Sequence, residues 1–315
     1  MGNSGPRVSG KIRTVLGVID PGQVKRCLMH EHLNLYNCTP APIGIRRDAR
    51  KMIVPRLTEL LQKHRCNALV ETSIEGTGRD LETYVYIAKK TTFHVIATAG
   101  FYVFPRTPAW YEDVSAKKIA RHLIRELTQG IDGTGILAGT LKGSSQSPRM
   151  HPLERKGFLA LAIAHQETGA PITTHAIGCG PEQVELLLKE GVAPERISIG
   201  HAGSGKVTLS GILRMVDLGC TVLFTDTISQ QGLDLADMPS WKFTLELLKR
   251  GHAERVMLSV DHWFEPRGNP AALASSGRSY SAVFDPFAKR LREHGVSAKT
   301  LDQIFVQNPR RMLSW

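Results

Sequence analysis

Short apolar runs rich in Val, Ile and Thr alternate along this chain with longer stretches in which apolar residues recur at helical spacing. The apolar runs predict strands at residues 26–33, 68–73, 94–101, 135–142, 171–176, 196–201, 220–226 and 255–261. The longer stretches predict helices at residues 49–64, 79–90, 114–128, 152–168, 181–189, 208–218, 241–250 and 284–294. Several of these helices run into a glycine, the usual C-terminal stop, before the next strand begins.

Regular alternation of strand and helix predicts a parallel sheet, because each helix carries the chain back to the edge where the next strand starts. Eight such units, with no Pro- or Ser-rich linker between the two halves, favour one α/β (β/α)8 TIM barrel over residues 1–315 rather than two domains. The segments after the first, seventh and eighth predicted strands are long and irregular. In such barrels the loops at the C-terminal ends of the strands form the active site.

The composition is that of an ordinary folded protein, with 42% hydrophobic and 22% charged residues. No apolar run approaches the roughly eighteen residues that a membrane span needs, and the N-terminal segment lacks the apolar core of a signal peptide. The five cysteines are widely spaced with no C-x-x-C pair, so neither a disulfide framework nor a zinc ribbon is indicated. We therefore expect a cytoplasmic protein with reduced thiols.

Lysine and arginine outnumber aspartate and glutamate by 40 to 29, a net charge of +11 that suits nucleic acid, an anionic surface or a negatively charged small molecule. The basic residues are scattered, with one small cluster at Arg46, Arg47, Arg50 and Lys51, and no basic run is interleaved with aromatic residues. We therefore expect no nucleic-acid or membrane partner. A small-molecule substrate, anionic in one interpretation of the charge, is the expected ligand.

Metal-capable side chains stand at the C-terminal ends of the predicted strands, where a barrel keeps its site. His30 and His32 end the first strand and lie two residues apart, so both side chains would face the same side and reach one metal ion. Taken alone, an H-x-H pair is as readily an incidental feature of a polar loop. Other strands, however, end in residues of the same kind, namely Lys142, His175, His201 and Asp261. Four histidines from three strands, joined by Asp261, predict a metal centre.

Lys142 is the odd member of this set, because an ammonium group would be repelled by divalent cations. One interpretation is a surface lysine at a strand end, as most lysines are. In the other, burial and nearby metal ions lower the pKa of its amine until the neutral form captures carbon dioxide, and the resulting carbamate bridges two metal ions. Only the second interpretation gives this lysine a role among cations.

Other catalytic motifs are missing from the sequence. There is no G-x-S-x-G nucleophile elbow, and no G-x-G-x-x-G follows a predicted strand. A serine hydrolase and a dinucleotide-binding enzyme are therefore disfavoured. Hydrolysis by metal-activated water requires neither a serine nor a cysteine nucleophile.

The ordered set of strand-end residues His30-x-His32, Lys142, His175, His201 and Asp261 resembles the metal ligands of the phosphotriesterase family of the amidohydrolase superfamily, together with its lactonase relatives. Shorter segments extend the resemblance over almost the whole chain, at residues 17–20 (GVID), 29–33 (MHEHL), 98–102 (TAGFY) and 308–313 (NPRRML). The order of the six residues is the specific part of the match, and the flanking segments support it. The resemblance implies a (β/α)8 barrel with a binuclear metal centre at its C-terminal face, and a homodimer.

By this resemblance the more buried metal ion is held by His30, His32 and Asp261, and the more exposed one by His175 and His201. Carboxylated Lys142 and a hydroxide bridge the two ions. The implied chemistry is two-metal hydrolysis, in which the cations polarise the scissile carbonyl or phosphoryl group and activate the bridging hydroxide, while Asp261 shuttles the proton. The expected catalytic residues are therefore Asp261 and Lys142. Zinc is the default metal, and cobalt, manganese or iron would suit the same ligands.

Residues expected to contact the substrate lie in loops beyond the strands. In lactonase relatives an aromatic residue after the third strand hydrogen-bonds the lactone, and Tyr102 matches it, with a rim aromatic that only packs as the equal alternative. Trp263 and Phe264 directly follow Asp261. They would form an apolar wall for an acyl or aryl group or, equally, pack against the barrel rim.

Arg106, Arg267 and Arg278 also fall in predicted loops on the catalytic face. Because the family includes enzymes that hydrolyse phosphorylated sugar lactones, these arginines would bind a phosphate or carboxylate, whereas solvated loop charge is the plainer interpretation. The arginine that lactonase relatives carry after the seventh strand falls at Thr227 here, and the eighth loop also differs from theirs. These departures count against a long-acyl homoserine lactone as the substrate.

We therefore expect a binuclear metal-dependent hydrolase of lactones or other carboxylic esters, with weak phosphotriesterase activity as a side reaction. An amide or a phosphotriester as the main substrate is the alternative within the same chemistry. An alternative from another class is a barrel that has lost catalysis and serves as a binding subunit. The presence of all six candidate ligands argues against that last alternative.

Overall fold

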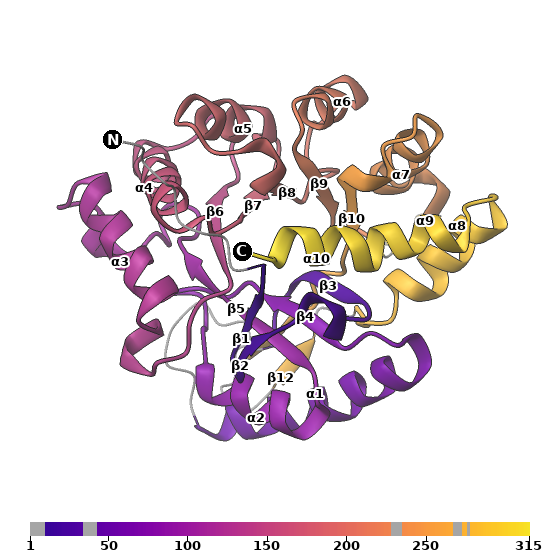
Figure 1. Ribbon diagram of the computed structural model, residues 1–315, viewed down its shortest axis with the longest axis horizontal. Coiled ribbons are helices and arrows are strands. Elements are labelled where there is room, and N and C mark those ends of the chain that lie inside the picture. Colours follow the sequence, from indigo (N-terminus) through magenta and orange to yellow (C-terminus); the bar gives the residue numbers. More distant parts are fainter. Residues whose placement is uncertain (1–9, 34–42, 228–234, 267–272, 276–277) are drawn as a thin grey trace.

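The computed structural model describes residues 10–33, 43–227, 235–266, 273–275 and 278–315, and Figure 1 shows strands at its centre with helices around them. The eight central strands are β3 (Cys27–Glu31), β4 (Ala68–Glu71), β5 (His94–Gly100), β6 (Thr140–Ser145), β7 (Ile172–Ala176), β8 (Ile197–Gly200), β9 (Thr221–Phe224) and β10 (Val256–Leu258). They pair in chain order, and every neighbouring pair is parallel. This arrangement confirms the predicted (β/α)8 TIM barrel.

A helix follows each barrel strand on the outside of the barrel (Figure 1). They are α1 (Ile43–His64), α2 (Leu81–Thr91), α3 (Ala116–Thr128), α4 (Pro152–Thr168), α5 (Gly180–Lys189), α6 (Leu209–Asp217), α7 (Pro239–Lys249) and α8 (Lys289–Glu293). Side-chain caps begin several of them, since the Ser115 hydroxyl accepts from the N–H of Lys118 and the Thr208 hydroxyl from that of Gly211. Gly169 ends α4 in the left-handed conformation (φ 76°), as its position in the sequence predicts.

Several predicted elements begin or end at other residues in the structure, and two differ in more than their ends. The strand predicted at residues 135–142 is displaced, because Gly135 has a positive φ (76°) and residues 131–139 form a connection. The observed strand β6 continues to Ser145 through its pairing with β7, so Lys142 lies inside the strand rather than at its end. The helix predicted at residues 284–294 begins as a π-helical segment (Val283–Ala288) and continues as α8, because Pro286 lacks a backbone N–H.

Further elements that the sequence pattern did not indicate cover the N-terminal end of the barrel. An antiparallel hairpin of β1 (Ile12–Thr14) and β2 (Gly17–Ile19) precedes the first barrel strand, and α9 (Ala298–Asp302) and α10 (Asn308–Leu313) follow the last helix. After α10, the Trp315 indole donates to the carbonyl oxygen of Gly139 at 2.7 Å, and its backbone N–H donates to that of Lys11 at 3.1 Å. In Figure 1, α10 crosses the centre of the view. The two ends of the described chain thus meet beneath the strands.

Shorter elements complete the connections. Short helical turns lie at Pro21–Gln23, Ala109–Tyr111, Ile131–Gly133, Pro194–Arg196, Leu235–Asp237, Ala253–Arg255 and Gln303–Gln307. An antiparallel pair, β11 (Phe264–Pro266) and β12 (Leu273–Ser275), follows the last barrel strand. None of the helices in the described part of the chain combines the length and the apolar character that crossing a membrane requires.

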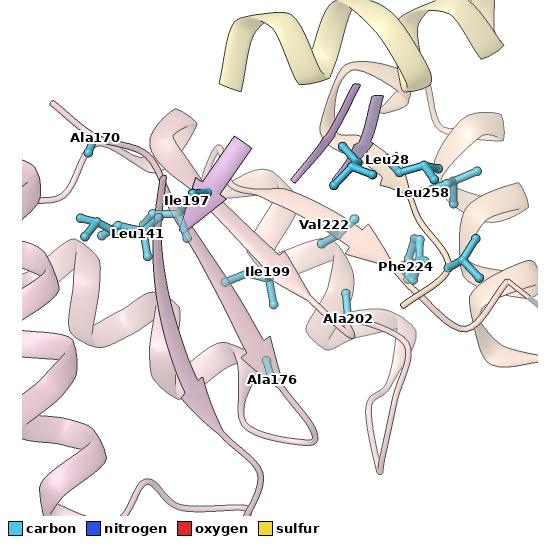
Figure 2. Close-up of a cluster of buried hydrophobic side chains, with 14 of the residues drawn as sticks. Leu28, Leu141, Ala170, Ala176, Ile197, Ile199, Ala202, Val222, Phe224 and Leu258 are labelled. Atoms are coloured by element: carbon cyan, nitrogen blue, oxygen red, sulfur yellow. The ribbon is translucent and has the colours of Figure 1, made fainter. Parts of the chain in front are cut away.

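Apolar side chains fill two layers, because alternate residues of each strand face opposite sides of the sheet. Leu28, Leu141, Ile197 and Val222 lie in the layer between the strands and the surrounding helices, and Figure 2 shows part of this cluster. On the opposite side of the strands, a second cluster of apolar side chains faces the barrel interior and packs with Ile12 of the N-terminal hairpin. The interior is therefore a packed core, and it supports the polar residues at the opposite, C-terminal end of the strands.

The barrel is closed by hydrogen bonds between β3 and the segment that follows β10. The backbone N–H of Asp261 donates to the carbonyl oxygen of His30 at 3.1 Å, and that of His32 donates to the carbonyl oxygen of His262 at 2.9 Å. The N–H of His30 also donates to the Ser259 hydroxyl at 3.0 Å. The pairing of β3 with β4 is irregular between Leu28 and Glu31, a bulge of the kind that aims side chains at active sites.

Candidate metal centre

The structure brings the predicted metal-binding residues together at the C-terminal end of the barrel. They are His30 and His32 at the end of β3, Lys142 in β6, His175 in β7, His201 directly after β8 and Asp261 after β10. One carboxylate oxygen of Asp261, Oδ1, lies 3.4 Å from His32 Nε2 and 3.8 Å from His30 Nε2. The ring centroids of His175 and His201 lie 4.3 Å apart, and those of His30 and His201 lie 4.8 Å apart.

The histidine nitrogens at this centre suit divalent metal ions. Both ring nitrogens of His30, and Nε2 of His175 and of His201, are buried with no hydrogen-bond partner among the described residues. Such atoms are destabilising unless something binds them, and a neutral imidazole nitrogen is a common ligand of transition metals. Burial lowers the pKa of His30 and of His175 well below the usual range, which favours that neutral form. Ligand atoms of His30, His201 and Asp261 lie within 4.8 Å of one another, so the residues fit a shared cation.

Hydroxyl groups outside the centre orient two of the histidine rings. The Ser73 hydroxyl is hydrogen-bonded to His32 Nδ1 at 2.7 Å, and the Thr225 hydroxyl is hydrogen-bonded to His201 Nδ1 at 2.7 Å. Fixing Nδ1 in this way turns the Nε2 atom of each ring toward the centre, as partners of metal ligands commonly do. Sequence reasoning missed both hydroxyls, because they follow other strands and carry no motif.

Lys142 is buried, with 1% of its surface exposed, so its interpretation as a surface lysine is wrong. Its amine donates to the carbonyl oxygen of Thr72 at 3.0 Å. Burial lowers the pKa of this amine to about 8. A neutral amine is therefore within reach near physiological pH, which is the form that reacts with carbon dioxide.

Two of the site residues, His201 and Asp261, have left-handed backbones, with φ of 55° and 56°. L-residues rarely adopt this conformation, which is enriched at functional sites. Before His201, a Cβ at Gly200 would collide with the carbonyl oxygen of Thr174, so only glycine fits there. The chain therefore turns sharply as it leaves β8 and again after β10, and these turns aim an imidazole and a carboxylate at the centre.

Glu31, between the first two histidines, fastens the segment that bears Asp261. Its buried carboxylate accepts hydrogen bonds from the Ser259 hydroxyl at 2.7 Å and from the backbone N–H groups of Val260 and His262, each at 2.9 Å. Burial raises the pKa of Glu31 to about 7. For Asp261 burial alone would also raise the pKa, but the hydrogen bond from His32 holds it well below its usual range. Of these two acidic side chains, Glu31 and Asp261, it is therefore Asp261 whose ionised form is favoured.

A cavity of about 490 Å³ opens above the centre, a size suited to a small molecule. Tyr102 and Trp263, both predicted to contact substrate, line it, and the Tyr102 ring lies 5.3 Å from that of His175. Phe264 does not line the cavity, because it is fully buried and packs on His262 at 4.6 Å. Cavity residues that sequence reasoning did not single out are Thr77, Gln146, Ile177, Ser204 and Asp226.

The three loop arginines that were predicted to lie on the catalytic face differ in where the structure places them. Arg106 lines the cavity, 5.8 Å from the Tyr102 ring, and Arg267 lies outside the described residues. Arg278 also lines the cavity, but its guanidinium donates to the carbonyl oxygen of Val260 at 2.9 Å and lies 3.7 Å from Asp261 Oδ2. With 8% of its side chain exposed, Arg278 is not a solvated loop charge.

Comparison with known proteins agrees with this geometry. Residues 10–313 match the model of the phosphotriesterase family. A phosphotriesterase homology protein of Escherichia coli (strain K12) is 32% identical, over 90% of this chain and 95% of that protein. The N-acetyltaurine hydrolase of Mus musculus is 26% identical, over 98% of this chain and 99% of that protein. A solved structure of a Deinococcus radiodurans PTE-like lactonase variant superposes with a TM-score of 0.84 at 27% identity, covering 96% of this chain and 99% of that one.

These matches extend over nearly the whole chain, and the barrel with its cluster of histidines and a carboxylate supplies the site that such enzymes need. A binding subunit without catalysis is therefore not the interpretation that the comparisons support. The chain belongs to the phosphotriesterase family and is a metal-dependent hydrolase.

Proposed function

We propose that this protein hydrolyses lactones or other carboxylic esters, with phosphotriesters as weak substrates. The observation that carries the proposal is the set of unpartnered, buried imidazole nitrogens that converge with Asp261 beneath a cavity of about 490 Å³. A metal centre at the base of this cavity would suit hydrolysis of a small uncharged carbonyl group, because the attacking group is water and no covalent intermediate with the protein is needed. The similarity to a PTE-like lactonase over almost the whole chain supports the same substrate class.

The proposal assigns two metal positions to the six residues. His30, His32 and Asp261 would hold one ion, His175 and His201 the other, and carboxylated Lys142 would join them. Zinc is the default, because imidazole and carboxylate ligands suit it. Two divalent cations bound there would act as Lewis acids toward the carbonyl oxygen and lower the pKa of water. The buried amine of Lys142, with its pKa lowered to about 8, supports a carbamate at that position.

In this proposal Asp261 moves the proton. Its Oδ1 faces the imidazoles of His30 and His32, while Oδ2 lies 3.7 Å from the Arg278 guanidinium at the edge of the cavity. An ionised carboxylate in that position would accept a proton from the attacking water and return it to the leaving alkoxide of the opened lactone. Arg278, held by the carbonyl oxygen of Val260, would keep the carboxylate oriented.

Tyr102 and Trp263 would bind the substrate. The Tyr102 ring stands 5.3 Å from the His175 ring and 5.8 Å from the Lys142 amine, so its hydroxyl can donate to a lactone oxygen above the centre. Trp263 lines the same cavity and offers an apolar wall for an acyl chain. Phe264 is buried away from the cavity, and we do not include it among the substrate contacts.

The experiment that tests the proposal compares kcat/KM for a lactone, an aryl ester, an N-acyl amide and a dialkyl aryl phosphate with metal-loaded protein. We expect the lactone or the ester to be the best substrate. Tyr102→Phe should lower kcat/KM for the lactone about tenfold and affect the phosphotriester less, because one hydrogen bond is lost. Tyr86→Phe, on the exposed side of α2, is the control. Equal losses on both substrates would count against the hydrogen bond to the lactone.

An amide is the second candidate substrate, and a specific similarity favours it. The N-acetyltaurine hydrolase of Mus musculus matches 98% of this chain, and its name describes hydrolysis of N-acetyltaurine, an amide that carries an anionic sulfonate group. Arg106 and Arg278 line the cavity, which suits an anionic group on the substrate. N-acetyltaurine and N-acetylated amino acids therefore belong in the same assay. A kcat/KM for these amides above that for every lactone and ester would replace the ester proposal.

A further inference from the structure

We propose that a second pocket, at the N-terminal end of the barrel, binds a small organic molecule that carries two phosphate groups. The pocket has a volume of about 390 Å³. Arg26 lies in its wall directly before β3, whereas His30 and His32 lie at the other end of the same strand. The pocket is therefore separated from the metal centre by the length of the barrel, and the proposal does not depend on the substrate proposed above.

The pocket collects positive charge from parts of the chain far apart in sequence. Its wall includes Arg26 before β3, Lys63 and Arg65 at the C-terminal end of α1, and Lys289 and Arg292 from α8. One carboxylate, that of Asp285, lies among the lining residues, so five cations less one anion leave a charge of +4. That many like charges around one hollow attract a multiply charged anion.

Within the described residues, no carboxylate oxygen lies within 4.0 Å of the charged nitrogens of Arg26, Arg65, Lys289 or Arg292. Lys63 has a partner, Glu59, at 2.7 Å on the exposed face of α1. An exposed pair of that kind contributes little and exchanges readily with other anions. The cations of this pocket are thus not consumed by the protein's own carboxylates.

Among the lining residues, Arg26 has a side chain that is already held in position to bind an anion. It is half-buried, and its Nη1 donates to the carbonyl oxygen of His64 at 3.0 Å. Burial and the nearby charges of Arg292 and Arg65 lower the pKa of Arg26. The guanidinium is therefore held in place beside other cations, and an anion in the pocket would relieve both the lost solvation and the repulsion.

The floor of the pocket is apolar and formed by packed aromatic rings. The His64 ring stacks on Phe284 at 5.1 Å and 17°, and Phe284 packs on Phe305 at 4.9 Å. Both phenylalanines are almost fully buried, with 4% and 1% of their surfaces exposed. They offer a ligand little apolar area, so recognition rests on charge and on guanidinium hydrogen bonds, which suit phosphate oxygens.

The test is titration calorimetry on the metal-loaded full chain with fructose bisphosphate as the probe. We expect one saturable site per chain that weakens as salt is raised. The double variant Lys289→Gln with Arg292→Gln would remove two exposed charges from the rim and should weaken binding at least about tenfold. Asp285→Asn, which removes the one carboxylate, should tighten it.

The matched control removes two exposed charges from α3, by Lys117→Gln with Arg121→Gln, and should leave binding within about twofold. Equal losses in both double variants would show a response to net charge alone and overturn the proposal. So would the absence of saturable binding to the unmodified chain, or an affinity for fructose monophosphate equal to that for the bisphosphate. Adenosine diphosphate, titrated in parallel, distinguishes a nucleotide from a sugar as the source of the two phosphates.

Discussion

The backbone N–H of Asp261 donates a hydrogen bond to the carbonyl oxygen of His30 at 3.1 Å, so the last and first strands of the barrel meet at the candidate metal centre itself. The side chains of the same two residues, His30 Nε2 and Asp261 Oδ1, lie 3.8 Å apart. Closing the barrel and assembling the site are therefore one structural event. A change that loosens the closure should separate the ligands as well as lower stability.

Glu31 gives the most direct way to loosen this closure. Glu31→Ala leaves the buried N–H groups of Val260 and His262 without their acceptor, and should lower the free energy of unfolding by about 3 kcal/mol. Glu31→Gln keeps one oxygen as an acceptor and should lose less. Urea denaturation measures both, and metal content per chain should fall in parallel. Glu167→Ala, at an exposed position of α4, should change stability by less than about 0.5 kcal/mol. Full stability and metal content in Glu31→Ala would show that the hydrogen bonds of the Glu31 carboxylate are unimportant for closing the barrel.

Asp261→Asn tests the carboxylate as both ligand and proton acceptor. The amide keeps the size and one oxygen of the side chain but has no negative charge to share with the imidazoles of His30 and His32. We expect kcat to fall by about a thousandfold, with fewer metal ions per chain by elemental analysis. Asp217→Asn, at an exposed position of α6, removes the same charge elsewhere and should retain turnover. Normal turnover in Asp261→Asn would rule out the assigned role.

Lys142→Ala tests the proposed carbamate. The substitution removes the buried amine and leaves room beside Tyr102, so activity should fall by about a thousandfold. Formate, acetate or propionate can enter that space and supply the missing carboxylate, and should restore part of kcat in proportion to its concentration. Lys117→Ala, at an exposed position of α3, should respond to none of them. A full loss with no rescue by any short acid, in protein that keeps its fold, would contradict a bridging carbamate.

Patterns within single segments were enough to predict the barrel and the positions of the candidate metal ligands. His175 lies near the C-terminal end of β7 and His201 directly follows β8, and parallel strands in a barrel present their C-terminal ends to one face, so local sequence determines where these rings lie. The hydrogen bonds of the Glu31 carboxylate could not be predicted, because the residues that donate them lie more than 200 residues away in sequence. The buried setting of Arg278 and the exclusion of Phe264 from the cavity likewise depend on how distant loops pack.

Away from the metal centre, His122 on α3 should make stability depend on pH. Its Nε2 lies 3.5 Å from carboxylate oxygens of both Glu126 and Glu75, and hydrogen bonds to these two groups raise the pKa of His122 to about 9. Arg79 is paired with the same Glu126, at 2.7 Å, so the cluster keeps its carboxylates ionised.

The sign of the effect follows from the raised pKa of His122, because the folded state holds its proton more tightly than the unfolded chain, whose pKa is about 6.5. The stabilisation is complete below about pH 6.5 and is lost as pH rises toward about 9. Urea denaturation across this range should show stability falling with pH, and His122→Gln should flatten that part of the profile. His252→Gln, which removes a partly exposed imidazole with no ion pair among the described residues, should keep the original slope. An unchanged slope in His122→Gln would mean that the Glu126 and Glu75 contacts do not hold the proton.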